Sequence, residues 1–238
     1  MAVGSSTPVP AEIDLSVLEA LKRYDSPTLS NAVEIFGVRP RDEGYMRHDV
    51  RCLFPELGVV VGYAATATMR ARGIGASDPE PLIRHVREVP GPRLVVVQDL
   101  DDEPAHGALW GEVMATTFTA LGCLGAVTDG SVRDLDEARA MGFHFFARAV
   151  SVSHGYARVE SAGEPVTVGG LTVRPGDLLH ADKHGVLLIP GEIAAELPAA
   201  ADRVIAAEQD YIAWVRSPEF DPDLLADRRS KMKEAFSR

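Results

Sequence analysis

The sequence predicts an α/β protein with a mostly parallel, helix-covered sheet, a β-rich second half and a helical C-terminal extension. Three observations predict this class. Strand-type and helix-type segments alternate between residues 58 and 128, which is typical of a parallel sheet. Short β-type runs separated by Gly and Pro turns then occupy residues 156–189. Apolar residues at helical spacing follow from residue 190 onward.

The composition is that of a folded globular chain. Of 238 residues, 46% are hydrophobic and 25% are charged, and no apolar run approaches the roughly 20 residues that a membrane-spanning helix needs. Acidic residues outnumber basic ones 35 to 24, and the basic residues are scattered, so we expect no nucleic-acid partner and no membrane partner. Cys52 and Cys123 lie far apart and the N-terminus has no secretory pattern; both features predict a cytoplasmic protein.

The N-terminal region is predicted to hold two helices. Residues 1–11 are small, polar and Pro-containing, which is typical of a flexible tail. After Asp14, a plausible N-cap, apolar residues recur at helical spacing as far as Tyr24, which predicts a helix of about three turns. The next elements are expected to be a short helix capped by Ser26 or Thr28 and closed by Gly37, and an irregular stretch over residues 39–57.

The sheet is expected to begin with a strand over residues 58–69. This run is rich in small and β-branched residues and lacks a helical period, as in a strand buried on both faces. The elements that follow are predicted, in order, to be a helix over 79–88, a strand over 93–98, a helix that starts near Leu109 and is closed by Gly122, and a strand over 125–128 that ends in a turn at Asp129–Gly130.

The second half is predicted to be β-rich and to end in helices. The expected elements are a helix over 135–141, a strand over 144–147, strands over 156–160, 165–168, 171–173, 177–180 and 186–189 with a hairpin turn at Gly169–Gly170, and helices over 190–215 and 222–236. No linker composition divides the chain. We therefore expect one domain over residues 12–190, with an extension over 191–238 that packs on the same domain or on a neighbouring subunit.

The stretch GAVTDGSVRD, residues 125–134, carries the clearest chemistry. An apolar strand leads to Arg133 and Asp134 just before a helix, and open α/β sheets bind their ligands at the carboxyl ends of strands. Arg133 offers a planar guanidinium suited to a carboxylate or an enolate oxygen. Asp134 offers a hard oxygen ligand suited to Mg²⁺ or Mn²⁺.

Glu112 lies near the start of the helix that precedes this strand. Free backbone N–H groups at a helix start bind anions, and Gly111 permits a close approach. A small 2-oxo acid could therefore place its carboxylate on the amides of Gly111, Glu112, Val113, Met114 and Ala115. It would then meet Arg133 at its keto oxygen and share a metal ion with Asp134.

These residues resemble a known family. The segments GALWGEVMATTFTALGCLGAVTDGSVRD, GFHFFARAVSVSHGYARV and PVTVGGLTVRPGDLLHADKHGVLLIP are similar, over about residues 55–190, to the RraA-like group. This group includes the class II 4-hydroxy-4-methyl-2-oxoglutarate/4-carboxy-4-hydroxy-2-oxoadipate aldolases. The resemblance implies an αββα sandwich, related to swivelling domains, in a homotrimer or homohexamer.

The resemblance also implies a function: a metal-dependent lyase that cleaves a 4-hydroxy-2-oxo di- or tricarboxylic acid to pyruvate, with oxaloacetate decarboxylation as a side activity. Arg133 would bind the pyruvyl group and stabilise its enolate, Asp134 would ligate Mg²⁺ (or Mn²⁺), and Glu112, where relatives often have Asp, would hold metal-bound water. The chemistry itself favours a metal, because the few lysines offer no clear Schiff-base candidate.

Other interpretations remain open. The protein could be a non-catalytic regulator of ribonuclease activity that acts by protein–protein contact, as RraA itself does, or an enzyme for another 2-oxo or hydroxy acid. Arg133 and Asp134 could form a salt bridge at a helix start with Asp134 as the N-cap, and Glu112 could merely complement the helix dipole. Asp99, Asp101 and Asp102 are expected to form a solvated turn. A structural turn is expected to contain His180, Asp182 and His184. His106 and His154 could each have a functional role.

Overall fold

The computed structural model describes residues 13–75 and 78–236, so the tail predicted for residues 1–11 lies outside the described residues. The strands are β1 (Arg51–Cys52), β2 (Val60–Arg70), β3 (Arg93–Asp99), β4 (Ala108–Trp110), β5 (Cys123–Val132), β6 (His144–Val150), β7 (Arg158–Ala162), β8 (Val166–Val168), β9 (Leu171–Val173), β10 (Leu178–Asp182) and β11 (Gly185–Ile189). The helices are α1 (Leu15–Leu21), α2 (Ser26–Phe36), α3 (Glu80–Glu88), α4 (Glu112–Ala120), α5 (Leu135–Ala140), α6 (Leu197–Val215) and α7 (Leu225–Phe236), with short 3₁₀ turns at Pro55–Leu57, Gly191–Ile193 and Pro222–Leu224.

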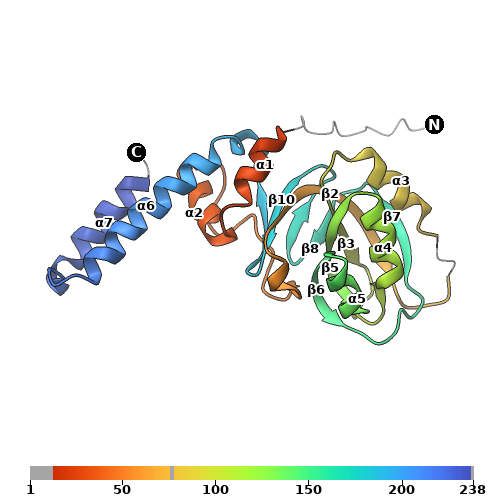
Figure 1. Cartoon of the computed structure of the whole chain (residues 1–238). Helices are drawn as coiled ribbons and strands as arrows, with labels where there is room; N and C mark the ends of the chain where they lie inside the picture. Colours follow the sequence, from red (N-terminus) through yellow and green to blue (C-terminus); the bar gives the residue numbers. More distant parts are fainter. Residues whose placement is uncertain (1–12, 76–77, 237–238) are drawn as a thin grey trace.

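A curled mixed sheet organises the molecule (Figure 1). Its strands run in the order β1-β6-β5-β3-β2-β10-β11, and β4 and β7 pair with β5 and β2. The pairs β2–β3, β3–β5, β4–β5 and β5–β6 are parallel, as the alternation of strands and helices predicted. The carboxyl ends of β3, β4, β5 and β6 therefore meet at one edge of the sheet.

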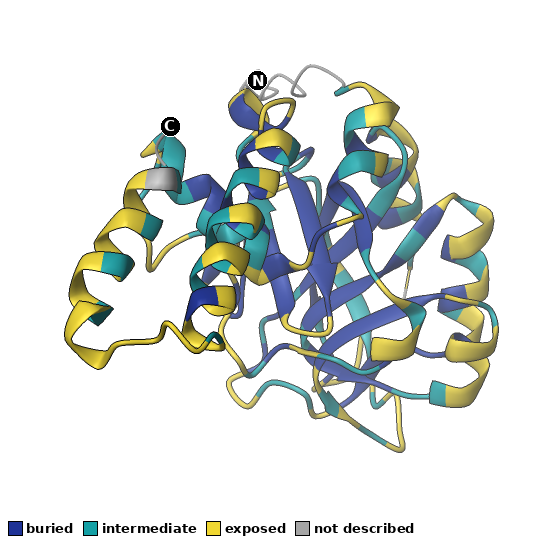
Figure 2. Cartoon of the chain, turned by 60° about the vertical axis from the view of Figure 1, so that its left-hand side comes forward, coloured by how far each residue is buried: buried dark blue, intermediate teal, exposed yellow. Residues whose placement is uncertain are grey.

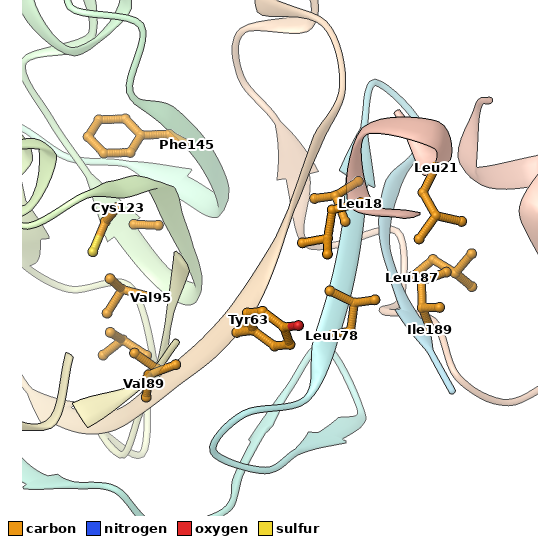
Figure 3. Close-up of a cluster of buried hydrophobic side chains, with 14 of the residues drawn as sticks. Leu18, Leu21, Tyr63, Val89, Val95, Cys123, Phe145, Leu178, Leu187 and Ile189 are labelled. Atoms are coloured by element: carbon orange, nitrogen blue, oxygen red, sulfur yellow. The ribbon is translucent and has the colours of Figure 1, made fainter. Parts of the chain in front are cut away.

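Two apolar clusters cover the two faces of the sheet. The larger cluster joins the helices to one face, and it includes Leu18 and Leu21 of α1 and Phe145 of β6 (Figure 3). The smaller cluster lies on the other face beneath the β8–β9 hairpin, where Val168 and Val173 are fully buried. Figure 2 shows that the central strands are buried along most of their length, and the burial of β2 confirms the prediction for the strand near residues 58–69.

The N-terminal helices differ in detail from the prediction. α1 is capped by Asp14 as expected, but it spans 7 residues, about two turns, and not three. α2 is capped by Asp25, whose carboxylate accepts a hydrogen bond from the Thr28 amide, and not by Ser26 or Thr28. Ser26 is unavailable as a cap because its hydroxyl lies 2.9 Å from the ring of His180.

The segment from Ala108 to Trp110 forms a strand, whereas the sequence predicted that the helix would start near Leu109. Parallel pairing with β5 holds this apolar triplet extended, so α4 begins only at Glu112. The turn predicted at Asp129–Gly130 is also wrong. β5 continues to Val132 through a bulge between Thr128 and Ser131, and Gly130 does not have a positive φ angle.

The C-terminal helices form a hairpin that projects from the sheet domain (Figure 1). The first half of α6 packs on α1 and α2, where the Tyr24 hydroxyl donates to Asp202 over 2.7 Å. Near the end of α6, Trp214 is buried against Phe220 and beneath the guanidinium of Arg228. The predicted long helix thus starts later than expected, at Leu197, after a 3₁₀ turn.

No helix within residues 13–75 and 78–236 is long and apolar enough to cross a membrane.

Candidate functional site

The candidate site lies where β4 and β5 end side by side. Arg133 follows β5 directly, and its backbone amide donates to the Trp110 carbonyl at the end of β4 over 2.9 Å. Trp110 is fully buried against Phe118 and Phe143, with ring centroids 5.1 and 5.8 Å away. The core therefore fixes the backbone from which Arg133 projects.

Asp134 adopts an unusual backbone conformation. Its φ of 53° and ψ of 52° place it in the left-handed region, which costs a non-glycine residue free energy and is common at functional sites. It occupies the N-cap position of α5, but its carboxylate does not cap that helix. Instead Oδ2 accepts a hydrogen bond of 3.0 Å from the amide of Glu112, the first residue of α4. Asp134 therefore holds the N-cap position that one interpretation gave it, but its side chain bonds to the start of α4 and does not cap α5.

Arg133 and Asp134 lie close together but do not form a tight ion pair. The Nε atom of Arg133 is 3.6 Å from Oδ2 of Asp134, and each side chain is about one-third exposed, at 35% and 33%. Both side chains are thus partly open to a ligand. A loose pair whose side chains are each about one-third exposed contributes little to stability, so a structural salt bridge alone does not account for the arrangement.

Gly111 is needed where α4 meets Asp134. A Cβ atom at this position would lie 2.5 Å from Oδ2 of Asp134 and 3.1 Å from Cγ and Nε of Arg133. Any side chain would therefore displace one or both groups. Here the absence of a side chain, and not a special φ angle, is the requirement, because Gly111 has an extended φ of −154°.

The amides predicted to bind a carboxylate are only partly available. The Ala115 amide already donates to the Gly111 carbonyl, and the Glu112 amide donates to Asp134, so these two cannot serve a ligand as the site stands. The amides of Val113 and Met114 precede the first hydrogen bond of the helix and stay open. Since the Val113 side chain is 75% exposed, the start of α4 faces solvent.

Asp134 and Glu112 are suited to binding a divalent ion weakly. Within the described part of the chain, no group of three or more His, Cys, Asp or Glu side chains could hold a metal by itself. Mg²⁺, however, commonly binds through one or two carboxylates and completes its shell with water and ligand oxygens. Asp134 supplies such a carboxylate at the mouth of the sheet, and Glu112 starts the facing helix. A substrate with adjacent keto and carboxylate oxygens would supply the remaining ligands.

A cavity of about 320 Å³ adjoins the start of α4. Its walls come from the loop after β2, from β4, from the first turn of α4 and from the loop before β7: Gly75, Ala108, Leu109, Met114, His154, Gly155, Tyr156 and Ala157. The loop is pressed against β4, because a Cβ on Gly107 would lie 2.6 Å from the His154 carbonyl. Met114 is thus shared between the predicted carboxylate-binding segment and this cavity.

Two buried carboxylates, Asp99 and Asp101, and the partly buried Asp129 lie near the same sheet edge. Asp99 and Asp101, predicted to form a solvated turn with Asp102, are only 4% and 7% exposed. Their oxygens accept hydrogen bonds from backbone amides of Ala105 and Ala71, so their role is structural. Asp129 accepts from the Asp99 amide, and burial and the nearby Asp99 charge raise its pKa to about 6. The sequence offered no signal for this burial beyond the density of Asp residues.

The histidines separate into structural and accessible ones. His180 is fully buried between the Ser26 hydroxyl and the Tyr24 carbonyl, and burial lowers its pKa. Asp182 accepts from Ser26 and His184, as a structural turn requires. The other two histidines that the sequence singled out, His106 and His154, are exposed: His106 lies 3.4 Å from the guanidinium of Arg72, and His154 lines the cavity beside α4.

Comparison with known proteins identifies the family. The model of the Aldolase/RraA family matches residues 26–188, more than half of the chain and all of the candidate site. The chain belongs to the Aldolase/RraA family. A Pseudomonas syringae protein provisionally named 4-hydroxy-4-methyl-2-oxoglutarate aldolase is 33% identical over 117 residues, covering 49% of this chain and 72% of the relative. Aldolase/RraA membership confirms the resemblance seen in the sequence.

Two other relatives are longer than the region they share with this chain. Protein DlpA of Legionella pneumophila is 29% identical over 191 residues, covering 76% of this chain but only 29% of DlpA. A Halalkalibacterium halodurans protein, also provisionally named 4-hydroxy-4-methyl-2-oxoglutarate aldolase, is 29% identical over 55% of this chain and 60% of its own length.

Solved structures confirm the α/β fold. A crystal structure of a Pseudomonas syringae protein has a TM-score of 0.71 at 24% identity and covers 97% of this chain and 98% of that one. Streptomyces coelicolor RraAS2, described as an unusual member of the RNase ES inhibitor RraA protein family, has a TM-score of 0.69 at 24% identity, over 85% of this chain and 100% of its own. These likenesses concern the fold.

Proposed function

We propose that the protein is a divalent-metal-dependent lyase that releases pyruvate from a 4-hydroxy-2-oxo acid, with oxaloacetate decarboxylation as a further activity. The observation that carries this proposal is the juxtaposition of the Arg133 guanidinium, the Asp134 carboxylate and the open amides of α4 at the carboxyl ends of β4 and β5. Di- and tricarboxylic 4-hydroxy-2-oxo acids belong in the first assays, because 4-hydroxy-4-methyl-2-oxoglutarate, a dicarboxylic acid of this class, stands in the provisional names of two relatives.

The residues of this chain would act on the pyruvyl half of the substrate. The amides of Val113 and Met114 bind the carboxylate at the positive end of the α4 dipole. Arg133 donates hydrogen bonds to the keto oxygen, which becomes negative when the neighbouring carbon–carbon bond breaks. Gly111 leaves the space in which these groups converge on the substrate.

Asp134 and Glu112 would hold Mg²⁺ or Mn²⁺, Asp134 directly and Glu112 through water. When bound, the ion supplies Lewis-acid chemistry that favours negative charge on the keto oxygen. The left-handed backbone of Asp134 supports this role, because its carboxylate is aimed at the start of a different helix at a cost in backbone energy.

The proposed reaction is a retro-aldol cleavage. The 4-hydroxyl group loses its proton to a base, the C3–C4 bond breaks, and C4 becomes the carbonyl carbon of an aldehyde or ketone. The bonding electrons form the enolate of pyruvate, which takes a proton at C3 to give pyruvate. In oxaloacetate decarboxylation, carbon dioxide leaves in place of the carbonyl compound, and the same enolate is protonated.

Exchange of the methyl protons of pyruvate with deuterium tests this proposal without any assumption about the leaving half. Purified protein with Mg²⁺ or Mn²⁺ should catalyse the exchange in D₂O, followed by proton NMR, and EDTA should abolish it. Oxaloacetate should also yield pyruvate. Absence of metal-dependent exchange and of pyruvate formation, together with capture of a ribonuclease by the protein, would favour a regulator that acts by protein–protein contact.

The proposal also includes the oligomeric state of the protein and its location in the cell. We propose a homotrimer or homohexamer in the cytoplasm, with no nucleic-acid partner. Exposed apolar side chains surround the candidate site, including Val113, Val150 and Val152, and are available for contacts between subunits. Light scattering coupled to size-exclusion chromatography should give three or six times the chain mass.

A further inference from the structure

A second cavity, of about 610 Å³, lies away from the candidate site. Its walls come from the segment after α2, from β2, and from β10, β11 and the turns that adjoin them. Tyr63, the wall residue from β2, pairs with Arg93, the first residue of β3. The cavity therefore adjoins the amino end of β3, whereas Arg133 and Asp134 follow the carboxyl end of β5. It shares no lining residue with the candidate site, and its volume suits a small molecule.

Arg39 places a fixed positive charge in the wall of this cavity. Its Nη1 atom donates to the Leu188 carbonyl over 2.9 Å. Its guanidinium lies against the backbone of Gly44, where a Cβ atom would overlap it. Burial lowers the pKa of Arg39. In the described part of the chain it forms no ion pair, and Glu43 and Glu192 act on its charge only from further away. The guanidinium is thus held in position without being neutralised, as a binding group for an anion requires.

Asp177 supplies a negative charge to the same cavity. Its Oδ2 atom accepts a hydrogen bond of 2.7 Å from the Arg174 amide, and its backbone carbonyl accepts one of 2.8 Å from the Ala64 amide of β2. These contacts fix the carboxylate in the turn before β10. Burial raises the pKa of Asp177, and among the residues that the structure describes it has no ion-pair partner. A half-buried carboxylate of this kind is stabilised by a cationic group.

The rest of the wall is mostly apolar. Leu178 pairs with Tyr63 on one side and with Ile189 on the other, and the three side chains lie close together in Figure 3. The charged lining consists of the Arg39 guanidinium and the carboxylates of Asp177 and Glu192. A ligand with a single charge would leave one sign of charge without a partner. A ligand that carries both charges on an apolar body matches the whole lining.

We infer that this cavity binds a free amino acid with an apolar side chain. The carboxylate of the ligand accepts hydrogen bonds from the Arg39 guanidinium, its ammonium group donates to Asp177, and its side chain lies against Leu178 and Ile189. This inference goes beyond the proposed function, because the cavity is separate from Arg133 and Asp134 and binding there needs no metal ion. The protein would thus have a second site for a small molecule.

A matched series of ligands tests this inference by isothermal titration calorimetry on the full chain at neutral pH. The series consists of L-leucine, of 4-methylpentanoate, which lacks the ammonium group, and of 3-methylbutylamine, which lacks the carboxylate. We expect one leucine per chain and at least about tenfold weaker binding of each analogue, because each loses one charged contact. L-phenylalanine, titrated separately, should also bind. Equal affinity for the three compounds of the series, or no binding of either amino acid at millimolar concentration, would overturn the inference.

Two variants assign the binding to this cavity. Arg39→Gln removes the cation and keeps a side-chain amide donor, so leucine should no longer bind better than 3-methylbutylamine. Asp177→Asn removes the anion and keeps an oxygen for the Arg174 amide, so leucine should no longer bind better than 4-methylpentanoate. Arg41→Gln is the matched control, because the Arg41 side chain is 77% exposed and lies outside the lining. Wild-type selectivity in both cavity variants would overturn the assignment.

A cavity that is covered by a second copy of the chain would behave differently. In that case wild-type protein should not bind leucine, and Arg39→Gln should change the mass of the assembly in light scattering. That pair of results would overturn the inference. Failure of the proposed function is a separate outcome, because exchange of the pyruvate methyl protons should be equal in Arg39→Gln and Arg41→Gln. Loss of exchange in the wild type would leave leucine binding intact.

Discussion

Oδ2 of Asp134 accepts a hydrogen bond of 3.0 Å from the backbone amide of Glu112, a residue 22 positions earlier in the chain. This contact joins the end of β5 to the start of α4, and it places the Asp134 carboxylate and the Glu112 side chain at the same mouth of the sheet. The Asp134 carboxylate, the Arg133 guanidinium and the backbone of the residue that begins α4 thereby lie next to one another.

Gly111→Ala should impair the site with little effect on the fold. The new Cβ would lie 2.5 Å from Oδ2 of Asp134, so the carboxylate must move. We expect metal-dependent exchange of the pyruvate methyl protons to fall by at least about 10²-fold, the scale of a lost transition-state contact. Gly191→Ala is the matched control, because its Cβ would meet no atom within 4 Å. Similar activity in both variants would contradict the proposed convergence.

Arg133→Ala should lower turnover by at least about 10²-fold, because a hydrogen-bond donor to the developing enolate is lost. Arg133→Lys keeps the charge but not the planar pair of donors, so we expect an intermediate rate. The measurement is kcat for pyruvate release from oxaloacetate, after subtraction of the rate without enzyme. If Arg133→Ala turns over at nearly the wild-type rate, the assigned role is wrong.

Glu112→Gln tests whether this side chain does more than complement the helix dipole. If Glu112 holds metal-bound water, the amide variant should lower the rate at least about tenfold, while Glu112→Asp should retain most of it, since the shorter acid keeps the charge. A change in stability of a few tenths of a kcal/mol with unchanged kinetics would instead indicate a dipole effect alone.

The raised pKa of Asp129 predicts that the free energy of unfolding depends on pH. Its pKa of about 6 in the folded protein, raised by burial and by Asp99, exceeds the ordinary value of 3.8. Between about pH 4 and 6 the folded state therefore holds a proton that the unfolded state has lost, so this group makes stability fall as pH rises through that window.

Asp129→Asn should remove this contribution, because the amide oxygen still accepts the hydrogen bond from the Asp99 amide and carries no charge. Since one pKa unit corresponds to about 1.4 kcal/mol, the rise from 3.8 to about 6 leads us to expect the variant to be more stable by about 3 kcal/mol at pH 8 and to gain little at pH 4. Urea unfolding at the two pH values measures both differences. An equal gain at both values would contradict the raised pKa.

Local patterns in the sequence were sufficient to predict most of the sheet. The run at 58–69 has the small and β-branched residues of a strand buried on both faces, and β2 is such a strand. The tight turn at Gly169–Gly170 was predictable because two adjacent glycines tolerate the positive φ angles found there, 54° and 78°. Each of these features depends on residues that are neighbours in the chain.

Features that depend on distant partners were not predictable. The local sequence of Ala108–Trp110 predicts the start of a helix, and only pairing with β5 makes this segment a strand. Asp129–Gly130 reads as a turn, yet the Asp99 amide, 30 residues away, binds the Asp129 carboxylate inside a continuous strand. In the site, Arg133 and Asp134 could be recognised as candidate functional residues from the sequence. The left-handed backbone of Asp134 and its hydrogen bond to the start of α4 could not be predicted.

Binding of Mn²⁺ in the presence of oxalate, a stable mimic of the pyruvate enolate, tests the central claim most directly. Free Mn²⁺ can be followed by its electron paramagnetic resonance signal in titrations of the wild-type protein and of Asp134→Asn, a substitution that the left-handed backbone tolerates. We predict one oxalate-dependent Mn²⁺ per chain in the wild type and at least about tenfold weaker binding in the variant. Equal Mn²⁺ affinity in the two proteins, or no oxalate-dependent binding in either, would contradict the account.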